Sequence, residues 1–129
     1  VSKGAHKAGG IVIGITCDKV FRTRRANPYL SQEIRECDLL HRMLRLVTMG
    51  DAYVALPGST GTLTEVFYVW NRILLGELPR KPLALLGDEW IKVMEVLLAQ
   101  RMISPAERNV ARLASNAQEA VRILLEEPH

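Results

Sequence analysis

Residues 51–76, DAYVALPGSTGTLTEVFYVWNRILLG, limit the possible folds of this chain more than any other stretch. A short apolar run at residues 52–56 is typical of a buried parallel strand. A turn of glycine and hydroxyl residues follows it. An apolar stretch of helical length, residues 63–75, then ends at Gly76. A strand, a glycine turn and a helix in direct succession predict an α/β fold.

The turn itself predicts an anion site. The first N–H groups of a helix have no acceptor within the helix and point toward whatever lies in front of it. Glycines let a ligand approach the backbone closely, and hydroxyl groups add hydrogen-bond donors. An ordinary tight connection between a strand and a helix is the alternative for the same pattern. We expect a phosphate group to bind at Gly58, Ser59, Thr60, Gly61 and Thr62.

Two other phosphate-binding motifs do not match the turn. A P-loop requires a lysine after its second glycine, and this turn contains no lysine. The dinucleotide motif requires G-x-G-x-x-G, whereas the spacing here is G-x-x-G without a third glycine.

Glu65 has two interpretations. Residues 62–65 spell T-x-x-E, which is the sequence of a capping box, and the helix dipole favours a carboxylate in the first turn. The same carboxylate also lies one turn inside the predicted phosphate site, where it could act on a bound ligand. The pattern alone leaves both roles open.

The segment PGSTGTLTE at residues 57–65 resembles the PGGxGTxxE motif of the LONELY GUY family, whose members were once regarded as possible lysine decarboxylases. The similarity extends over nearly the whole chain and includes AGGIVIGI, NPYLSQEI, LPGSTGT and KPLALLGDEW. It implies a Rossmann-like, doubly wound parallel sheet. It also implies hydrolysis of a nucleoside 5′-monophosphate to free base and ribose 5-phosphate. Ser59 stands where the family has its second glycine, and serine would be strained there if the position needs a positive φ.

The resemblance assigns catalysis to two residues, Glu65 near the ribose and Arg42. Arg42 matches by position the arginine of the family's MHxRK segment, although Leu39, Leu40, His41 and Met43 replace the other members. On the pattern alone, Arg42 is an exposed residue of an amphipathic helix at residues 38–49 that Asp38 caps. A non-catalytic nucleotide or cofactor carrier on the same fold is the alternative function.

The rest of the chain predicts one Rossmann-like domain, residues 1–129, which lacks the first strand and glycine turn of the family. A helix ends at Gly9-Gly10, and Cys17 to Gln32 form a loop that carries Arg22, Arg24 and Arg25. Strands are expected at residues 11–16, 81–86 and 110–113. Helices are expected at residues 89–100, with Asp88 as the cap, and at residues 116–127. A turn is expected at Pro105.

Composition limits the classes of partner that the chain is expected to bind. With 48% hydrophobic residues, no bilayer-spanning run and no signal peptide, the chain is expected to be a cytoplasmic protein without membrane contact. Cys17 and Cys37 show no metal-ligand spacing and His41 is interpreted as a surface residue, so no metal is expected. An aromatic content of 5% disfavours nucleic-acid binding despite the net charge of +3.

Two further expectations concern cofactors and assembly. A pyridoxal phosphate enzyme needs a lysine in a preformed pocket, and only Lys19 follows a predicted strand closely, so no cofactor is expected. The helix at residues 63–75 is apolar on nearly every face, which indicates a subunit contact and a homodimer or larger assembly.

Overall fold

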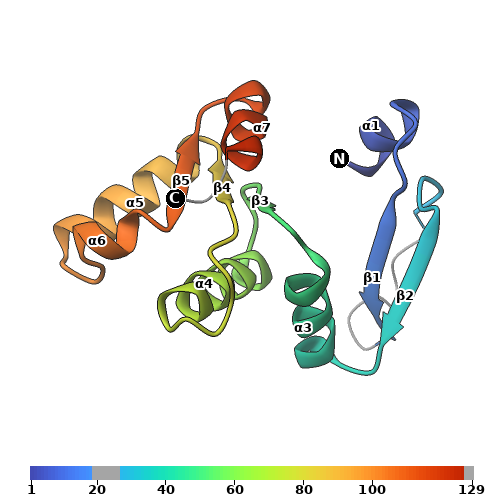
Figure 1. Cartoon of the computed structure of the whole chain (residues 1–129), viewed down its shortest axis with the longest axis horizontal. Coiled ribbons are helices and arrows are strands. Elements are labelled where there is room, and N and C mark those ends of the chain that lie inside the picture. The colour runs from blue at the N-terminus through green and yellow to red at the C-terminus, as the bar shows by residue number, and fades with distance from the viewer. Residues whose placement is uncertain (19–26, 127–129) are drawn as a thin grey trace. The chain divides into compact units, whose positions relative to one another are not determined.

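A computed structural model describes residues 1–18 and 27–126 of the chain (Figure 1). The predicted arginine cluster, Arg22, Arg24 and Arg25, and also Lys19, lie outside the described residues. The chain forms two compact units, Val1–Met49 and Gly50–His129, and each is described by itself. That the whole chain makes one domain stays a prediction.

The first unit opens with helix α1 (Ser2–Lys7), which ends as the sequence predicts. Gly9 has a φ of 81°, the left-handed conformation that glycine adopts without strain. The Gly9 N–H donates to the His6 carbonyl at 3.0 Å, and the Gly10 N–H donates to the Ala5 carbonyl at 2.9 Å. These two bonds form a Schellman motif, which satisfies carbonyls that the helix end would leave without donors.

Strands β1 (Ile13–Cys17) and β2 (Gln32–Glu36) form a parallel pair in which Ile15 lies opposite Ile34. Strand β1 begins two residues after the predicted strand. The loop predicted from Cys17 to Gln32 is wrong at both ends, because Cys17 ends β1 and Gln32 begins β2. The sequence QEIRE hides the second strand, since Ile34 is its single apolar residue and only alternates with charged neighbours.

Helix α3 (Leu39–Met49) completes the first unit. The backbone N–H of His41 donates to Asp38 Oδ1 at 2.8 Å, which confirms Asp38 as the N-cap. Val47 of this helix and Cys17 of β1 are both buried, at 2% and 0% exposure. The core of this unit therefore forms between one helix face and the end of β1.

The second unit contains a parallel sheet in the order β3-β4-β5. Its strands are β3 (Tyr53–Ala55), β4 (Leu83–Leu86) and β5 (Ala111–Ala114). The central strand β4 carries three consecutive buried residues, as the continuous apolar run predicts for a strand covered on both faces. The prediction of strands at 81–86 and 110–113 is confirmed to within two residues at each end.

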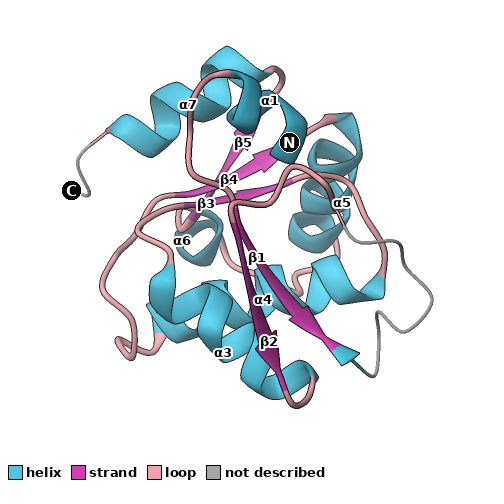
Figure 2. Ribbon diagram, turned by 90° about the vertical axis from the view of Figure 1, so that its right-hand side faces the viewer, coloured by secondary structure: helices cyan, strands magenta, loops and turns pink. Residues whose placement is uncertain are grey.

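Four helices accompany this sheet, α4 (Thr60–Leu74), α5 (Asp88–Ala99), α6 (Pro105–Arg108) and α7 (Ala117–Leu125) (Figure 2). Helix α7 packs Ala120 and Ile123 against Ala84 of β4 and Ala114 of β5. A hydrogen bond links α4 to α6: Nε1 of Trp70 donates to the Glu107 carbonyl at 2.8 Å. Parallel sheets flanked by helices confirm the predicted α/β, Rossmann-like fold class.

Two helix starts differ from the prediction. Asp88 is the first residue of α5 and not its cap, because Gly87 holds the N-cap position. Pro105 begins the short helix α6 where only a turn was expected, which fits the preference of proline for the first helical position. Among the described helices, none has the length and apolar character needed to cross a membrane.

Candidate functional site

The predicted phosphate-binding turn lies between β3 and α4, and the helix starts earlier than expected. Ser59 is the N-cap of α4, with φ −107° and ψ −161°. The first bond within the helix runs from the Leu63 N–H to the Ser59 carbonyl at 3.1 Å. The N–H groups of Thr60, Gly61 and Thr62 therefore precede any acceptor that the helix can supply, and they point out of its N-terminus. This is the arrangement that favours an anion.

The two glycines of the turn have different roles. A Cβ atom at Gly58 would lie 2.1 Å from Thr62 Oγ1 and 2.8 Å from Thr62 Cβ, so a side chain there would force the turn to move. At Gly61, an added Cβ atom would have no heavy atom of the other described parts of the chain within 4 Å, apart from its chain neighbours and the backbone of its own helix. Gly58 is thus required for the close approach of Thr62, whereas Gly61 leaves open space at the helix end.

Ser59 has an unstrained backbone conformation, although it stands at a glycine position of the family motif. Its φ of −107° is extended backbone, which any residue adopts. The second glycine of the family motif is therefore not needed here for a left-handed conformation.

The capping-box prediction for Glu65 is wrong. Helix α4 begins at Thr60, so its third residue is Thr62, and Glu65 is its sixth. Glu65 follows Gly61 by four residues and Thr62 by three, which places all three on one face of the helix. Long side chains in a helix lean toward its N-terminus. The half-buried Glu65 is therefore placed to extend toward the glycine turn.

Gly87 supports the turn from the neighbouring strand. It directly follows β4 and has a φ of 125°. A Cβ atom at Gly87 would lie 2.9 Å from Cγ of Pro57, the first residue of the motif. Because β3 and β4 are adjacent and parallel, their carboxyl ends meet at the same edge of the sheet, where α/β folds place their ligands.

Arg42 belongs to the first unit and not to the unit that carries the glycine turn. Its Nε donates to the Ile15 carbonyl at 2.8 Å, and the residue is half-buried. The interpretation of Arg42 as a merely solvent-exposed residue is therefore wrong. Arg45 is more exposed and pairs with Glu36 at 2.7 Å. The structure thus places the turn Gly58–Thr62 at the N-terminus of α4 and Glu65 in the same helix, while the catalytic role of Arg42 stays a prediction.

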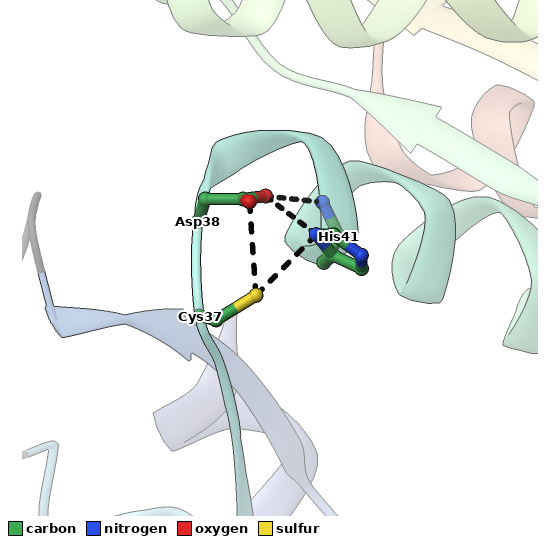
Figure 3. A group of neighbouring side chains, drawn as sticks. All are labelled: Cys37, Asp38 and His41. Carbon is green, nitrogen blue, oxygen red and sulfur yellow. Dashed lines mark hydrogen bonds and ion pairs between the residues drawn. The ribbon is translucent and has the colours of Figure 1, made fainter.

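A second group of reactive side chains lies at the junction of β2 and α3 (Figure 3). Cys37 Sγ lies 3.4 Å from His41 Nδ1 and 3.6 Å from Asp38 Oδ2, and His41 Nδ1 lies 2.8 Å from Asp38 Oδ1. The backbone N–H and then the ring of His41 lower the pKa of Asp38 to about 2. Partial desolvation and then the Asp38 charge raise the pKa of the Cys37 thiol.

Sequence reasoning missed this group. His41 is exposed, as predicted, but the absence of metal-ligand spacing around it was a wrong inference, since three possible ligand atoms lie within 4.8 Å of one another. The available signal was a cysteine directly before a predicted N-cap aspartate, with a histidine one turn later. A cap brings the side chain of the N-cap residue back over the first turn.

Residues 1–124 match the protein family described as "Possible lysine decarboxylase". The chain belongs to this family. Among its relatives is the cytokinin riboside 5′-monophosphate phosphoribohydrolase LOG7 of Arabidopsis thaliana, 29% identical over 98% of this chain and 60% of the relative. LOG3 of the same plant is 31% identical over 98% of this chain and 60% of its own length. The resemblance to the LONELY GUY family is thereby confirmed.

A relative from a second organism has about the same sequence identity to this chain. The cytokinin riboside 5′-monophosphate phosphoribohydrolase of Rhodococcoides fascians is 28% identical over 94% of this chain and 64% of its own length. A solved structure titled TM1055 is 26% identical, with a TM-score of 0.64 over 95% of this chain and 68% of that one. The chain thus spans about three-fifths of the length of the curated relatives described.

Proposed function

We propose that this chain carries the phosphate-binding and ribose-facing part of a nucleoside 5′-monophosphate phosphoribohydrolase. The reaction breaks the bond between the ribose C1′ and the base nitrogen. Water supplies the hydroxyl group at C1′ and a proton to the base, so the products are free base and ribose 5-phosphate. The names of the relatives support this activity and suggest a cytokinin-type riboside monophosphate as one substrate to test.

One observation carries the proposal. The N-terminus of α4 offers three successive N–H groups without acceptors in the helix, beside a glycine that Thr62 needs for its close approach. A phosphate group at this end would accept hydrogen bonds from backbone donors and gain from the helix dipole. Because the phosphate is remote from the reacting bond, its binding would orient the ribose and raise the rate of the chemical step.

Glu65 is the proposed catalytic carboxylate. Cleavage of a glycosidic bond passes through a ribosyl centre with developing positive charge. A carboxylate one turn inside the phosphate site would stabilise that charge or position the attacking water. Arg42 is proposed to contact the phosphate or the leaving base. A non-catalytic carrier would need the turn but not the carboxylate, so Glu65 distinguishes the two functions.

The test is a panel of nucleoside 5′-monophosphates and the matching nucleosides, incubated with the protein and analysed for free base by chromatography. We expect release of base from at least one monophosphate and far less from its nucleoside. Binding of a monophosphate without release of base would favour the carrier instead.

We also propose that α4 contributes to a homodimer. Leu63, Phe67 and Leu74 stay between 37% and 42% exposed although they are large and apolar. Phe67 stacks on the buried Trp70 with ring centroids 5.7 Å apart, so the exposed ring is held in place. A fixed apolar surface of this kind favours contact with a second subunit.

Sedimentation of the protein and of Phe67→Glu tests the dimer. We expect a dimer that the charge on residue 67 dissociates, whereas Lys92→Glu on the exposed side of α5 leaves it intact. A monomeric parent protein at micromolar concentration would contradict the proposal.

A further inference from the structure

Three side chains with metal-ligating atoms converge at the start of α3, in the unit that does not contain the glycine turn. They are the thiol of Cys37, the carboxylate of Asp38 and the imidazole of His41 (Figure 3). The proposed phosphoribohydrolase mechanism uses none of them. Cys37 and His41 are exposed and Asp38 is half-buried, so the group is open to solvent.

Helix capping explains only part of this arrangement. Asp38 Oδ1 accepts from the His41 backbone N–H at 2.8 Å, which is the bond a cap requires. A cap requires neither a thiol 3.6 Å from the other carboxylate oxygen nor an imidazole nitrogen 3.4 Å from that thiol. The convergence of the Cys37 and His41 side chains therefore needs another explanation.

A nucleophilic triad does not fit the geometry. In such a triad the nucleophile faces one ring nitrogen of the histidine, which takes its proton, and the carboxylate faces the other, where it orients the ring. Here Cys37 Sγ and Asp38 Oδ1 both approach the same nitrogen, Nδ1 of His41, at 3.4 Å and 2.8 Å. Convergence on one nitrogen places the three donor atoms around a common point.

Two of the three printed distances match those between ligand atoms of a tetrahedral zinc ion, whereas His41 Nδ1 and Asp38 Oδ1 lie 2.8 Å apart. With Zn–S near 2.3 Å and Zn–N or Zn–O near 2.1 Å, a tetrahedron separates its ligand atoms by about 3.3–3.6 Å. The separations of Sγ from Nδ1, 3.4 Å, and of Sγ from Oδ2, 3.6 Å, already agree with this geometry. We propose that Cys37, Asp38 and His41 bind a zinc ion through Sγ, a carboxylate oxygen and Nδ1.

Asp38 can cap the helix and hold the metal at the same time. Its Oδ1 accepts from the backbone of His41, and its Oδ2 faces the thiol of Cys37. Zinc would bind Oδ2 and replace the hydrogen bond between the His41 ring and the carboxylate. The thiol proton is released to solvent on binding, because the thiolate is the ligand. Three protein ligands leave a fourth position for water.

The donor set selects against other common ions. Magnesium and calcium prefer oxygen ligands and seldom accept a thiolate. A thiolate, an imidazole and a carboxylate together suit zinc, and cobalt(II) serves as a spectroscopic substitute. Because Cys37 follows β2 and His41 lies in the first turn of α3, the ion would link the strand end to the helix.

Calorimetric titration of the whole chain with zinc chloride tests the site. We expect one ion per chain, and a loss of affinity of at least about 10-fold in each of Cys37→Ser, His41→Gln and Asp38→Asn. Asparagine caps helices as well as aspartate does, so Asp38→Asn should keep the fold while it loses the charged ligand. Circular dichroism checks that each variant is folded.

Matched controls come from the same unit. Cys17 is the other free cysteine and is fully buried, and His6 is an exposed histidine of α1. Cys17→Ala and His6→Gln should bind zinc as tightly as the parent chain. Cobalt(II) should give a thiolate-to-metal charge-transfer band that Cys37→Ser abolishes and Cys17→Ala keeps.

Two results would overturn the zinc site. One is equal zinc affinity of the parent chain, Cys37→Ser and His41→Gln, and the other is a cobalt complex without a thiolate band. Neither measurement involves a nucleotide, so failure here and failure of the phosphoribohydrolase proposal are separate outcomes.

Discussion

Helices of the second unit begin in two different ways. At α6, the Glu107 N–H donates to Ser104 Oγ at 3.2 Å and the Ser104 N–H donates to Glu107 Oε2 at 2.6 Å, which completes a capping box. At α7, the Glu119 N–H donates to Asn116 Oδ1 at 2.8 Å. At α4, by contrast, no capping bond from the Ser59 side chain is found in the part of the chain that the structure describes.

The difference separates capped helix ends from a candidate ligand site, and α5, which also lacks a side-chain cap, differs from α4 because Asp88 and Glu89 lie in its first turn. At α6 and α7, the N-cap side chain accepts a hydrogen bond from a backbone N–H group of the first turn. Each of these first turns also carries a carboxylate, Glu107 or Glu119. The first turn of α4 has neither the cap nor an acidic residue, although Ser59 could cap by its chemistry. Donors left in this way at a glycine-rich helix end are suited to an anionic ligand.

The largest expected effect concerns two glutamates with opposite roles. Glu65→Gln should lower turnover of the nucleoside monophosphate by ~100-fold, because the charge that stabilises the ribosyl centre is lost. Its melting temperature should change little, since glutamine keeps nearly the same volume and an acceptor oxygen. Glu107→Gln is the matched control and should leave turnover unchanged. Turnover and melting temperature are measured on the same samples, and full activity in Glu65→Gln would remove the catalytic assignment.

A second test compares the two glycines of the turn. Gly58→Ala should weaken monophosphate binding by at least about 10-fold, because the new Cβ displaces Thr62 and at least one charge-assisted hydrogen bond is lost. Gly61→Ala adds the same methyl group without displacing the turn and keeps the backbone N–H, so its loss of binding should be smaller than that of Gly58→Ala. Calorimetry with a monophosphate and with its nucleoside measures both. Equal losses for the two ligands would contradict a phosphate site.

The third prediction concerns the caps themselves. Asn116→Ala should lower the free energy of unfolding by ~1 kcal/mol, because the N–H of Glu119 loses its acceptor. Ser59→Ala should change it by less than about 0.5 kcal/mol, since no capping bond is removed. Urea denaturation of both variants provides the comparison. A larger loss in Ser59→Ala than in Asn116→Ala would show that α4 is capped in solution.

The smallest effect is the acid dependence of the capped ends. Hydrogen bonds from the backbone and side chain of Ser104 lower the pKa of Glu107 from its usual 4.5, and Ser115 lowers that of Glu119 in the same way. Groups with a lowered pKa stabilise the fold above the unfolded value and lose that contribution as the pH falls through the folded value.

The difference in melting temperature between the parent chain and the double variant Glu107→Gln, Glu119→Gln should therefore be present at neutral pH. It should shrink as the pH falls below 4.5. Melting temperatures across this range measure it, and a gap that widens with acid would be the contrary result.

The same sequence pattern explains why part of the site was predictable and part was not. T-x-x-E at residues 62–65 and S-x-x-E at residues 104–107 both fit a capping box, yet only the second forms one. Pro105 fixes the start of α6 at the residue after Ser104. The weak helix formers Thr60 and Gly61 conceal the first turn of α4, which starts three residues before the predicted helix.

Other successes and failures have similar causes. The apolar run of β4 and the periodic pattern of α7 depend on burial, so the sequence predicts them directly. Strand β2 has one apolar residue and gives almost no burial signal. The Cys37, Asp38 and His41 group depends on how a cap turns its side chain back over the helix, so only the combination of a cap with the flanking cysteine and histidine indicates it.

The contact between Gly87 and Pro57 has a consequence for protein engineering. The nine-residue motif is one continuous stretch of sequence, but its first residue lies close to a glycine thirty positions away along the chain. Transplanting residues 57–65 into another α/β scaffold should fail to reproduce the turn unless the next strand also ends in glycine. The minimal transferable cassette is two loops, not one.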